Sequence, residues 1–113
     1  MKLQKIWHAF LYSLHGGRLL FSQRPALQEL AAAGLIALLF WWIGARPSDY
    51  LIMAAIVLLM LSLEAINTAI EEVVDRVSPE ISEMARNAKD LGSFAVFCIQ
   101  IILTGWVIWV VLR

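Results

Sequence analysis

The sequence predicts an all-α integral membrane protein, in which an N-terminal amphipathic surface helix precedes three transmembrane helices. Hydrophobic residues make up 61% of the 113 residues, and the mean hydropathy is +0.76. A soluble domain of this size buries only roughly 60–70% of the surface that its unfolded chain exposes, so it would leave much apolar surface in water. Three long apolar runs supply the spans. We expect one membrane domain over residues 1–113, with the spans inside helices at 26–45, 50–75 and 90–112.

Residues 1–22 have the pattern of an amphipathic helix that lies in the plane of the membrane surface. Apolar side chains recur at helical spacing, at Leu3, Ile6, Trp7, Phe10, Leu11 and Leu14. The opposite face is polar and carries Lys5, His8 and Tyr12. The regular pattern ends near the glycine pair at 16–17, and we expect a turn from there to Pro25.

Each span is a long run with few charged residues. The first, at 26–45, is almost uncharged and ends in a polar turn. The second begins at Leu51, is apolar apart from Ser62 as far as Leu63, and becomes polar from Glu64 onwards without a break in the helical pattern. The third, from Leu91 to Leu112, has no charged residue. About 20 apolar residues suffice to cross a bilayer core, so the chain can cross it three times.

The charged residues predict how the chain is oriented. Seven basic residues flank the spans on one side: Lys2, Lys5, Arg18, Arg24, Arg76, Arg86 and Lys89. Only Arg46 and Arg113 lie on the other side. Because basic residues are enriched in cytoplasmic segments, we expect the N-terminus and the loop at 76–88 to be cytoplasmic. Nine basic and nine acidic residues cancel, which argues against a nucleic-acid partner.

The polar end of the second long helix carries the first candidate site. On a helix, Glu64, Asn67 (or Thr68), Glu71 and Asp75 share one stripe, because each lies three or four residues from the next. Ionisable groups at the centre of a span cost at least about 2.5–3.5 kcal/mol and usually mark function. A divalent cation would relieve the repulsion between the carboxylates, and magnesium usually arrives with phosphates.

Two other interpretations of this stripe stay open. It can be a solvated helix end, which suits Glu72 and Asp75 better than Glu64, since Glu64 directly follows the apolar run. Asn67 can instead join two helices through its amide, as polar side chains often do in membranes.

A second group of residues precedes the third span. Lys89 is a compact cation able to meet a phosphate, and Asp90 is a candidate cap of the new helix. Gly92 and Ser93 are small enough to let another helix pack closely. Together with the acidic stripe, these residues supply the cation and carboxylates needed to position ATP and to withdraw a proton from a hydroxyl.

Three sequence blocks resemble the bacterial diacylglycerol kinase family: Glu64-Ala-Ile-Asn67-Thr-Ala-Ile-Glu71, Val-Val-Asp75-Arg76, and Ala88-Lys89-Asp90-Leu-Gly92-Ser93-Phe-Ala-Val. The resemblance covers nearly the whole chain. It implies a homotrimeric bundle in the bacterial cytoplasmic (inner) membrane. It also implies transfer of the γ-phosphate of ATP to diacylglycerol, which gives phosphatidic acid, with Mg²⁺ as the metal ion.

The resemblance further implies a role for individual residues. Glu64 would be the catalytic base, Asn67 would help to order the site, and Glu71 would bind Mg²⁺. The residues that would contact the nucleotide and its metal are Lys5, Tyr12, Gln23, Glu71, Glu80, Ile81, Ser82, Lys89 and Asp90. Those near the lipid would be Arg18, Phe21, Glu64 and Ser93.

Gln23 marks a departure from the family pattern. The family commonly places a second metal-binding glutamate at this position, which is Gln23, or Arg24 if this chain lacks one residue here. A glutamine oxygen binds Mg²⁺ less strongly than a carboxylate does. Glu29, further along the same helix, is a candidate to compensate.

Two alternative functions stay open at this point. One branch of the family phosphorylates undecaprenol, although Gly92-Ser93 and Asp75-Arg76 favour the diacylglycerol branch. The weakened ligand at Gln23 would also suit a non-catalytic membrane relative, but the polar groups kept at costly positions argue against that.

Overall fold

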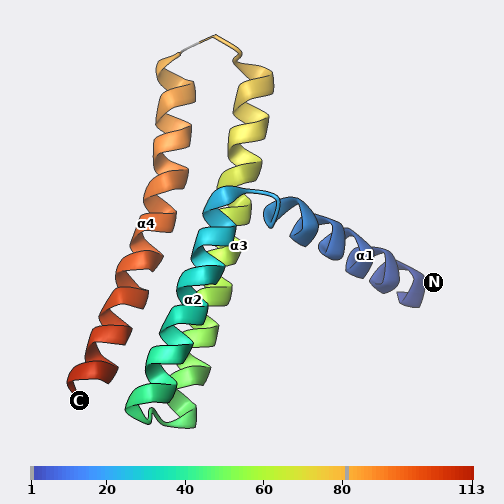
Figure 1. The fold of residues 1–113 in the computed structure, drawn as a ribbon. Helices are drawn as coiled ribbons and strands as arrows, with labels where there is room; N and C mark the ends of the chain where they lie inside the picture. The colour runs from blue at the N-terminus through green and yellow to red at the C-terminus, as the bar shows by residue number, and fades with distance from the viewer. Residues whose placement is uncertain (1, 81) are drawn as a thin grey trace.

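The computed structural model describes residues 2–80 and 82–113, and every regular element within them is an α-helix. The helices are α1 (Lys2–Leu20), α2 (Arg24–Ile43), α3 (Pro47–Val77) and α4 (Glu83–Leu112). By length and composition, α2, α3 and α4 can each cross a membrane, which confirms the predicted helical membrane architecture with three spans. In Figure 1, these three run side by side and α1 projects away from them at a wide angle. That α1 lies in the membrane surface stays a prediction.

The first two helices differ from expectation at the segment that joins them. α1 does not end at the glycine pair but continues to Leu20. Glycine costs only about 1 kcal/mol relative to alanine inside a helix, and the buried side chain of Leu20 secures the last turn against the rest of the chain. α2 then begins at Arg24 with Pro25 in its first turn, where the missing N–H of proline breaks no hydrogen bond.

Local signals explain how α2 ends and α3 begins. Gly44 closes α2 in the left-handed conformation, with φ of 71°, which a residue without Cβ adopts at little cost. α3 starts at Pro47, and the side chain of Asp49 accepts a hydrogen bond from the N–H of Arg46 at 2.9 Å. The helix continues to Val77, so the apolar span and the polar stripe form one continuous rod.

α4 begins seven residues earlier than the predicted helix at 90–112. Ser82 is its N-cap, because the Ser82 hydroxyl accepts a hydrogen bond from the N–H of Ala85 at 3.1 Å. The prediction that Asp90 caps this helix is therefore wrong, and Asp90 lies on its third turn. The apolar run marked only the part of the helix that is suited to lipid, whereas the cap lies in the polar loop.

The core of the bundle lies between α3 and α4, with α2 covering one side. Its buried residues are Phe40, Met53, Val57, Met60, Ile99, Leu103 and Val110. Large apolar side chains such as Leu35, Leu58 and Ile102 remain exposed on the outer faces of the helices. Exposed apolar faces are expected where the surrounding solvent is lipid.

An ion pair joins α3 and α4 at the end of the bundle far from the polar stripe. The Asp49 side chain is only 1% exposed, and Arg113 donates hydrogen bonds to both of its carboxylate oxygens. The indole N–H of Trp106 donates to the backbone carbonyl of Asp49 at 3.2 Å. These contacts fix the start of α3 against the end of α4.

Candidate active site

A cavity of about 890 Å³ opens between α2, α3 and α4. Its polar lining residues include Gln23, Gln28, Glu29, Glu64, Asn67, Thr68, Glu71, Ser93 and Gln100. Its apolar wall includes Ile36, Met60, Val96, Leu103 and Val107. A cavity that combines a few polar groups with an apolar wall is the form that binding sites for small molecules usually take.

The polar stripe of α3 supplies one side of this cavity. Glu64 and Asn67 are buried, at 6% and 8% exposed, and Glu71 follows one turn further along. The Thr68 hydroxyl donates to the backbone carbonyl of Glu64 at 3.0 Å, so it bonds within its own helix. The structure thus brings Glu64, Asn67 and Glu71 to one cavity, and their roles in the reaction stay predictions.

Close helix packing holds Asn67. Its amide Nδ2 donates to Oε1 of Glu71 at 3.4 Å. On α4, Gly92 lies so close that a Cβ there would overlap Oδ1 of Asn67. That Oδ1 atom is buried and has no hydrogen-bond partner among the described residues. A buried acceptor without a partner is costly, so the close approach of α4 at Gly92 holds this amide oxygen in an unsatisfied position.

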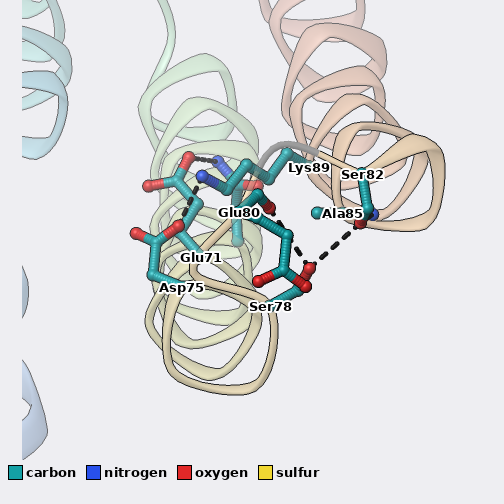
Figure 2. Close-up of polar contacts among 8 residues, drawn as sticks. Glu71, Asp75, Ser78, Glu80, Ser82, Ala85 and Lys89 are labelled. Atoms are coloured by element: carbon teal, nitrogen blue, oxygen red, sulfur yellow. Dashed lines mark hydrogen bonds and ion pairs between the residues drawn. The ribbon is translucent and has the colours of Figure 1, made fainter.

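Asp75, the last member of the stripe, does not line the cavity. Figure 2 shows Lys89 reaching from α4 towards Asp75 on α3, with Glu71 beside them. Nζ of Lys89 lies 2.5 Å from Oδ1 of Asp75, and both side chains are partly exposed. An exposed pair of this kind adds little stability. Lys89 therefore places a positive charge next to Glu71, and its side chain stays partly exposed to solvent.

The loop before α4 lies at the same end of the helices. Ser78 is buried and donates to the backbone carbonyl of Glu80 at 3.3 Å, and its Oγ lies 3.0 Å from Oγ of Ser82. Figure 2 shows the bonds that Ser78 makes within this loop. Ile81, the third predicted nucleotide contact of the loop, lies outside the described residues.

Some of the predicted residues are not brought to the cavity. Gln23 and Ser93 line it, but these predicted residues do not: Lys5, Tyr12, Arg18, Phe21, Glu80, Ser82 and Lys89. Tyr12 is 74% exposed and stacks on His8, with ring centroids 6.4 Å apart. Asp90 is exposed on α4 and also lies outside the lining.

A polar pair that sequence reasoning did not join crosses the membrane part of the cavity. Nε2 of Gln100 on α4 lies 3.5 Å from Oε1 of Glu29 on α2 and points towards it as a donor. Glu29 is 8% exposed, and its charged neighbour is Glu64. Glu29 therefore lies next to the predicted base, in the cavity that Glu71 also lines, and its role as a substitute for Gln23 stays a prediction. The signal in the sequence that could have pointed to Glu29 is that it is an acidic residue inside an apolar span.

Comparison with known proteins matches the sequence to one family. The profile of the family described as prokaryotic diacylglycerol kinase matches residues 11–112. A diacylglycerol kinase of Sinorhizobium sp. is 50% identical over 97 residues, which cover 86% of this chain and 71% of that protein.

More distant relatives carry the same description. The diacylglycerol kinase of Haemophilus influenzae is 35% identical over 102 residues, which cover 87% of this chain and 86% of that protein. The diacylglycerol kinase of Escherichia coli K12 is 31% identical over 102 residues, which cover 89% and 82% respectively. The match extends over nearly all of the chain, including every residue that lines the cavity. The chain therefore belongs to the prokaryotic diacylglycerol kinase family and is a lipid kinase.

Proposed function

We propose that the protein transfers the γ-phosphate of ATP to diacylglycerol and so produces phosphatidic acid. The observation that carries this proposal is the buried carboxyl group of Glu64, which is 6% exposed and lines a cavity with an apolar wall. An ionisable group kept inside a membrane span needs a function to justify its cost. The relatives in Sinorhizobium and Haemophilus are named diacylglycerol kinases, which supports this lipid as substrate.

In the proposed reaction, Glu64 acts as general base. Its carboxylate accepts the proton of the lipid hydroxyl, whose oxygen forms a bond to the γ-phosphorus of ATP while the bond from that phosphorus to the β,γ-bridging oxygen breaks. ADP leaves and phosphatidic acid remains. In this proposal the lipid lies beside Glu64, with its hydroxyl near Ser93 and its acyl chains along the apolar wall of the same cavity. A positioned base contributes about 10²–10⁴-fold to such a reaction.

The residues near Glu71 fit a magnesium ion that is delivered by ATP. Glu71 offers a carboxylate and Gln23 an amide oxygen, and both residues line the cavity. Mg²⁺ that arrives with ATP takes most of its ligands from phosphates and water, so two protein oxygens suffice in this proposal. When bound, it would neutralise charge on the transferred phosphoryl group.

The remaining nucleotide contacts lie towards the same end. Lys89 carries a positive charge beside Glu71, and a lysine is a common point-charge partner of phosphate. We propose that Lys5 and Tyr12 of α1, with Asp90 and the loop residues Glu80 and Ser82, complete the nucleotide pocket. The single chain leaves α1 apart from the bundle in Figure 1, so assembly is needed to bring these groups together.

A homotrimer supplies that assembly in our proposal. The outer faces of α2, α3 and α4 expose large apolar side chains, and three helices enclose little by themselves. The three spans and the family fit a bacterial inner membrane protein. We propose that the N-terminus and the loop before α4 are cytoplasmic, because seven of nine basic residues lie on that side. ATP would then enter from the cytoplasm.

Glu64→Gln tests the proposed base. We expect phosphoryl transfer from labelled ATP to diacylglycerol in detergent micelles to fall by at least about 100-fold, with the oligomer still assembled. Ser62→Ala is the matched control, because Ser62 is exposed on the same helix and its hydroxyl bonds only to the backbone carbonyl of Leu59 at 2.8 Å. Unchanged turnover in Glu64→Gln would remove Glu64 as base. Product from undecaprenol but none from diacylglycerol would refute the proposed substrate.

A further inference from the structure

Acidic groups are concentrated in the cavity between α2, α3 and α4. Glu29, Glu64 and Glu71 all line it, whereas no lysine, arginine or histidine is among its described lining residues. Glu29 and Glu64 are both more than nine-tenths buried. Glu64 is the charged neighbour of Glu29, and both carboxyl groups face the same cavity. They come from different helices, α2 and α3, so the fold itself brings them together.

The two oxygens of Glu29 have different surroundings. Oε1 is the acceptor for the amide of Gln100 on α4, at 3.5 Å. Oε2 is buried and has no hydrogen-bond partner in the described part of the chain. A buried polar atom without a partner costs about 1–3 kcal/mol, and two neighbouring carboxylates that are both ionised repel strongly at low dielectric. One proton held between Glu29 and Glu64 removes both costs.

Resting on the proposed function, we propose that Glu29 is a positioning residue for the catalytic base. In its neutral form Glu29 donates a hydrogen bond from Oε2 to the carboxylate of Glu64, while Gln100 holds the other oxygen and so fixes the direction of that bond. Glu64 then presents its remaining lone pairs to the lipid hydroxyl. Glu29 itself stays outside the reaction and neither touches ATP nor exchanges its proton.

The side chain of Gln100 sets the direction of the hydrogen bonds from α4 through Glu29 to Glu64. An amide N–H can only donate, so Oε1 of Glu29 must accept, and this leaves Oε2 as the oxygen that can carry hydrogen towards α3. Thr104, one turn beyond Gln100, bonds to the backbone carbonyl of Gln100 at 2.8 Å and does not compete for Glu29. The order of donors therefore runs from Gln100 through Glu29 to Glu64.

Replacement of Glu29 by glutamine or by leucine distinguishes a positioning residue from a metal ligand and from a residue without a role in the reaction. In Glu29→Gln, the amide oxygen can accept from Gln100 and the amide nitrogen can donate to Glu64, so we expect kcat for diacylglycerol within about threefold of wild type. Glu29→Leu removes the donor, and because a hydrogen bond to a charged group is lost, we expect kcat to fall about 10–100-fold. The KM for MgATP and the Mg²⁺ concentration for half-maximal rate should not change in either variant.

Gln100→Leu tests the anchor, and Ser62→Ala again serves as the control. Without its anchor Glu29 can turn away, so we expect kcat to fall by several-fold in Gln100→Leu, while Ser62→Ala retains the wild-type value. Circular dichroism and size-exclusion chromatography in micelles would check that each variant is folded. Should Glu29→Leu fail to fold, Glu29→Gln still distinguishes a hydrogen-bond donor from a metal ligand. A metal ion bound by Glu29 would require the negative charge that glutamine lacks.

Two results would overturn the proposal. One is a Glu29→Gln variant that is as slow as Glu64→Gln and needs more Mg²⁺, which would make Glu29 a metal ligand. The other is a folded Glu29→Leu variant with the kcat of the wild type. Failure of the proposed function looks different, because then the wild-type protein and Ser62→Ala would themselves transfer no phosphate from ATP to diacylglycerol.

Discussion

Replacing Gly92 with alanine tests whether close packing of α3 and α4 holds Asn67 in the active site. A Cβ at Gly92 would overlap Oδ1 of Asn67 and lie 3.2 Å from its Cγ, whereas Cα of Asn67 is 3.7 Å away, an ordinary contact distance. The overlap is with the end of a side chain, so the two helices can keep their spacing if Asn67 rotates. Rotation would break the 3.4 Å bond from Asn67 to Glu71.

The effect on stability should be small because two contributions oppose each other. Alanine is favoured over glycine inside a helix by about 0.5–1 kcal/mol, and the lost hydrogen bond costs about 0.5–1.5 kcal/mol. The free energy of unfolding of Gly92→Ala should therefore fall by less than about 1 kcal/mol.

The effect on activity should be larger, because Glu71 loses its amide partner and Asn67 leaves its place. A hydrogen bond to a charged group is worth about 1.5–3 kcal/mol, and a donor–acceptor distance of 3.4 Å puts this bond at the weak end of that range. About 1.4 kcal/mol corresponds to a factor of ten in rate. We therefore expect kcat to fall about tenfold in Gly92→Ala.

Phosphoryl transfer to diacylglycerol and thermal unfolding, both in micelles, measure the two effects. Gly105→Ala is the control, because a Cβ at Gly105 on the same helix meets nothing within 4 Å, and it should leave kcat unchanged. In an Asn67→Ala background, Gly92→Ala should cost no further activity, since the overlapping group is gone. Wild-type activity in Gly92→Ala, or an equal loss in both backgrounds, would refute the reasoning.

Two further predictions concern stability at the two ends of the bundle. Asp49→Asn should lower the thermal midpoint by several degrees, because it leaves Arg113 without its buried partner. It should leave kcat almost unchanged, because this ion pair lies far from the polar stripe. Adding Arg113→Gln should lower the midpoint little further, and full additivity of the two losses would contradict the pairing. Ser82→Ala should cost about 1 kcal/mol of unfolding free energy through loss of the α4 N-cap. Ser13→Ala, whose hydroxyl bonds to its own helix, should change that free energy little, and equal effects in both variants would show that Ser82 is not a cap.

Some boundaries of the fold could not be predicted from apolar runs. The runs gave the number of spans, because crossing a bilayer demands about 20 apolar residues in succession. They placed the start of the last helix seven residues late, because Ser82 caps it in a polar loop. They also placed the end of α1 too early, because two glycines weaken a helix without ending it when Leu20 is buried beyond them.

The polar stripe of α3 was determined by the sequence itself. Glu64, Asn67 and Glu71 are neighbours on one helix, and their spacing alone puts them on one face. Once that helix is established, no tertiary contact is needed to align the three side chains. The family resemblance rests largely on these residues, and the family match confirms it.

Only the tertiary structure decided which polar groups meet from different helices. Glu29 and Gln100 are 71 residues apart in the chain, and Asp49 and Arg113 are 64 apart. Helical periodicity relates residues within one helix only, whereas the rotation of α2 against α3 and α4 is set by how their side chains pack. That packing turned an isolated acidic residue in the first span, Glu29, towards the predicted base.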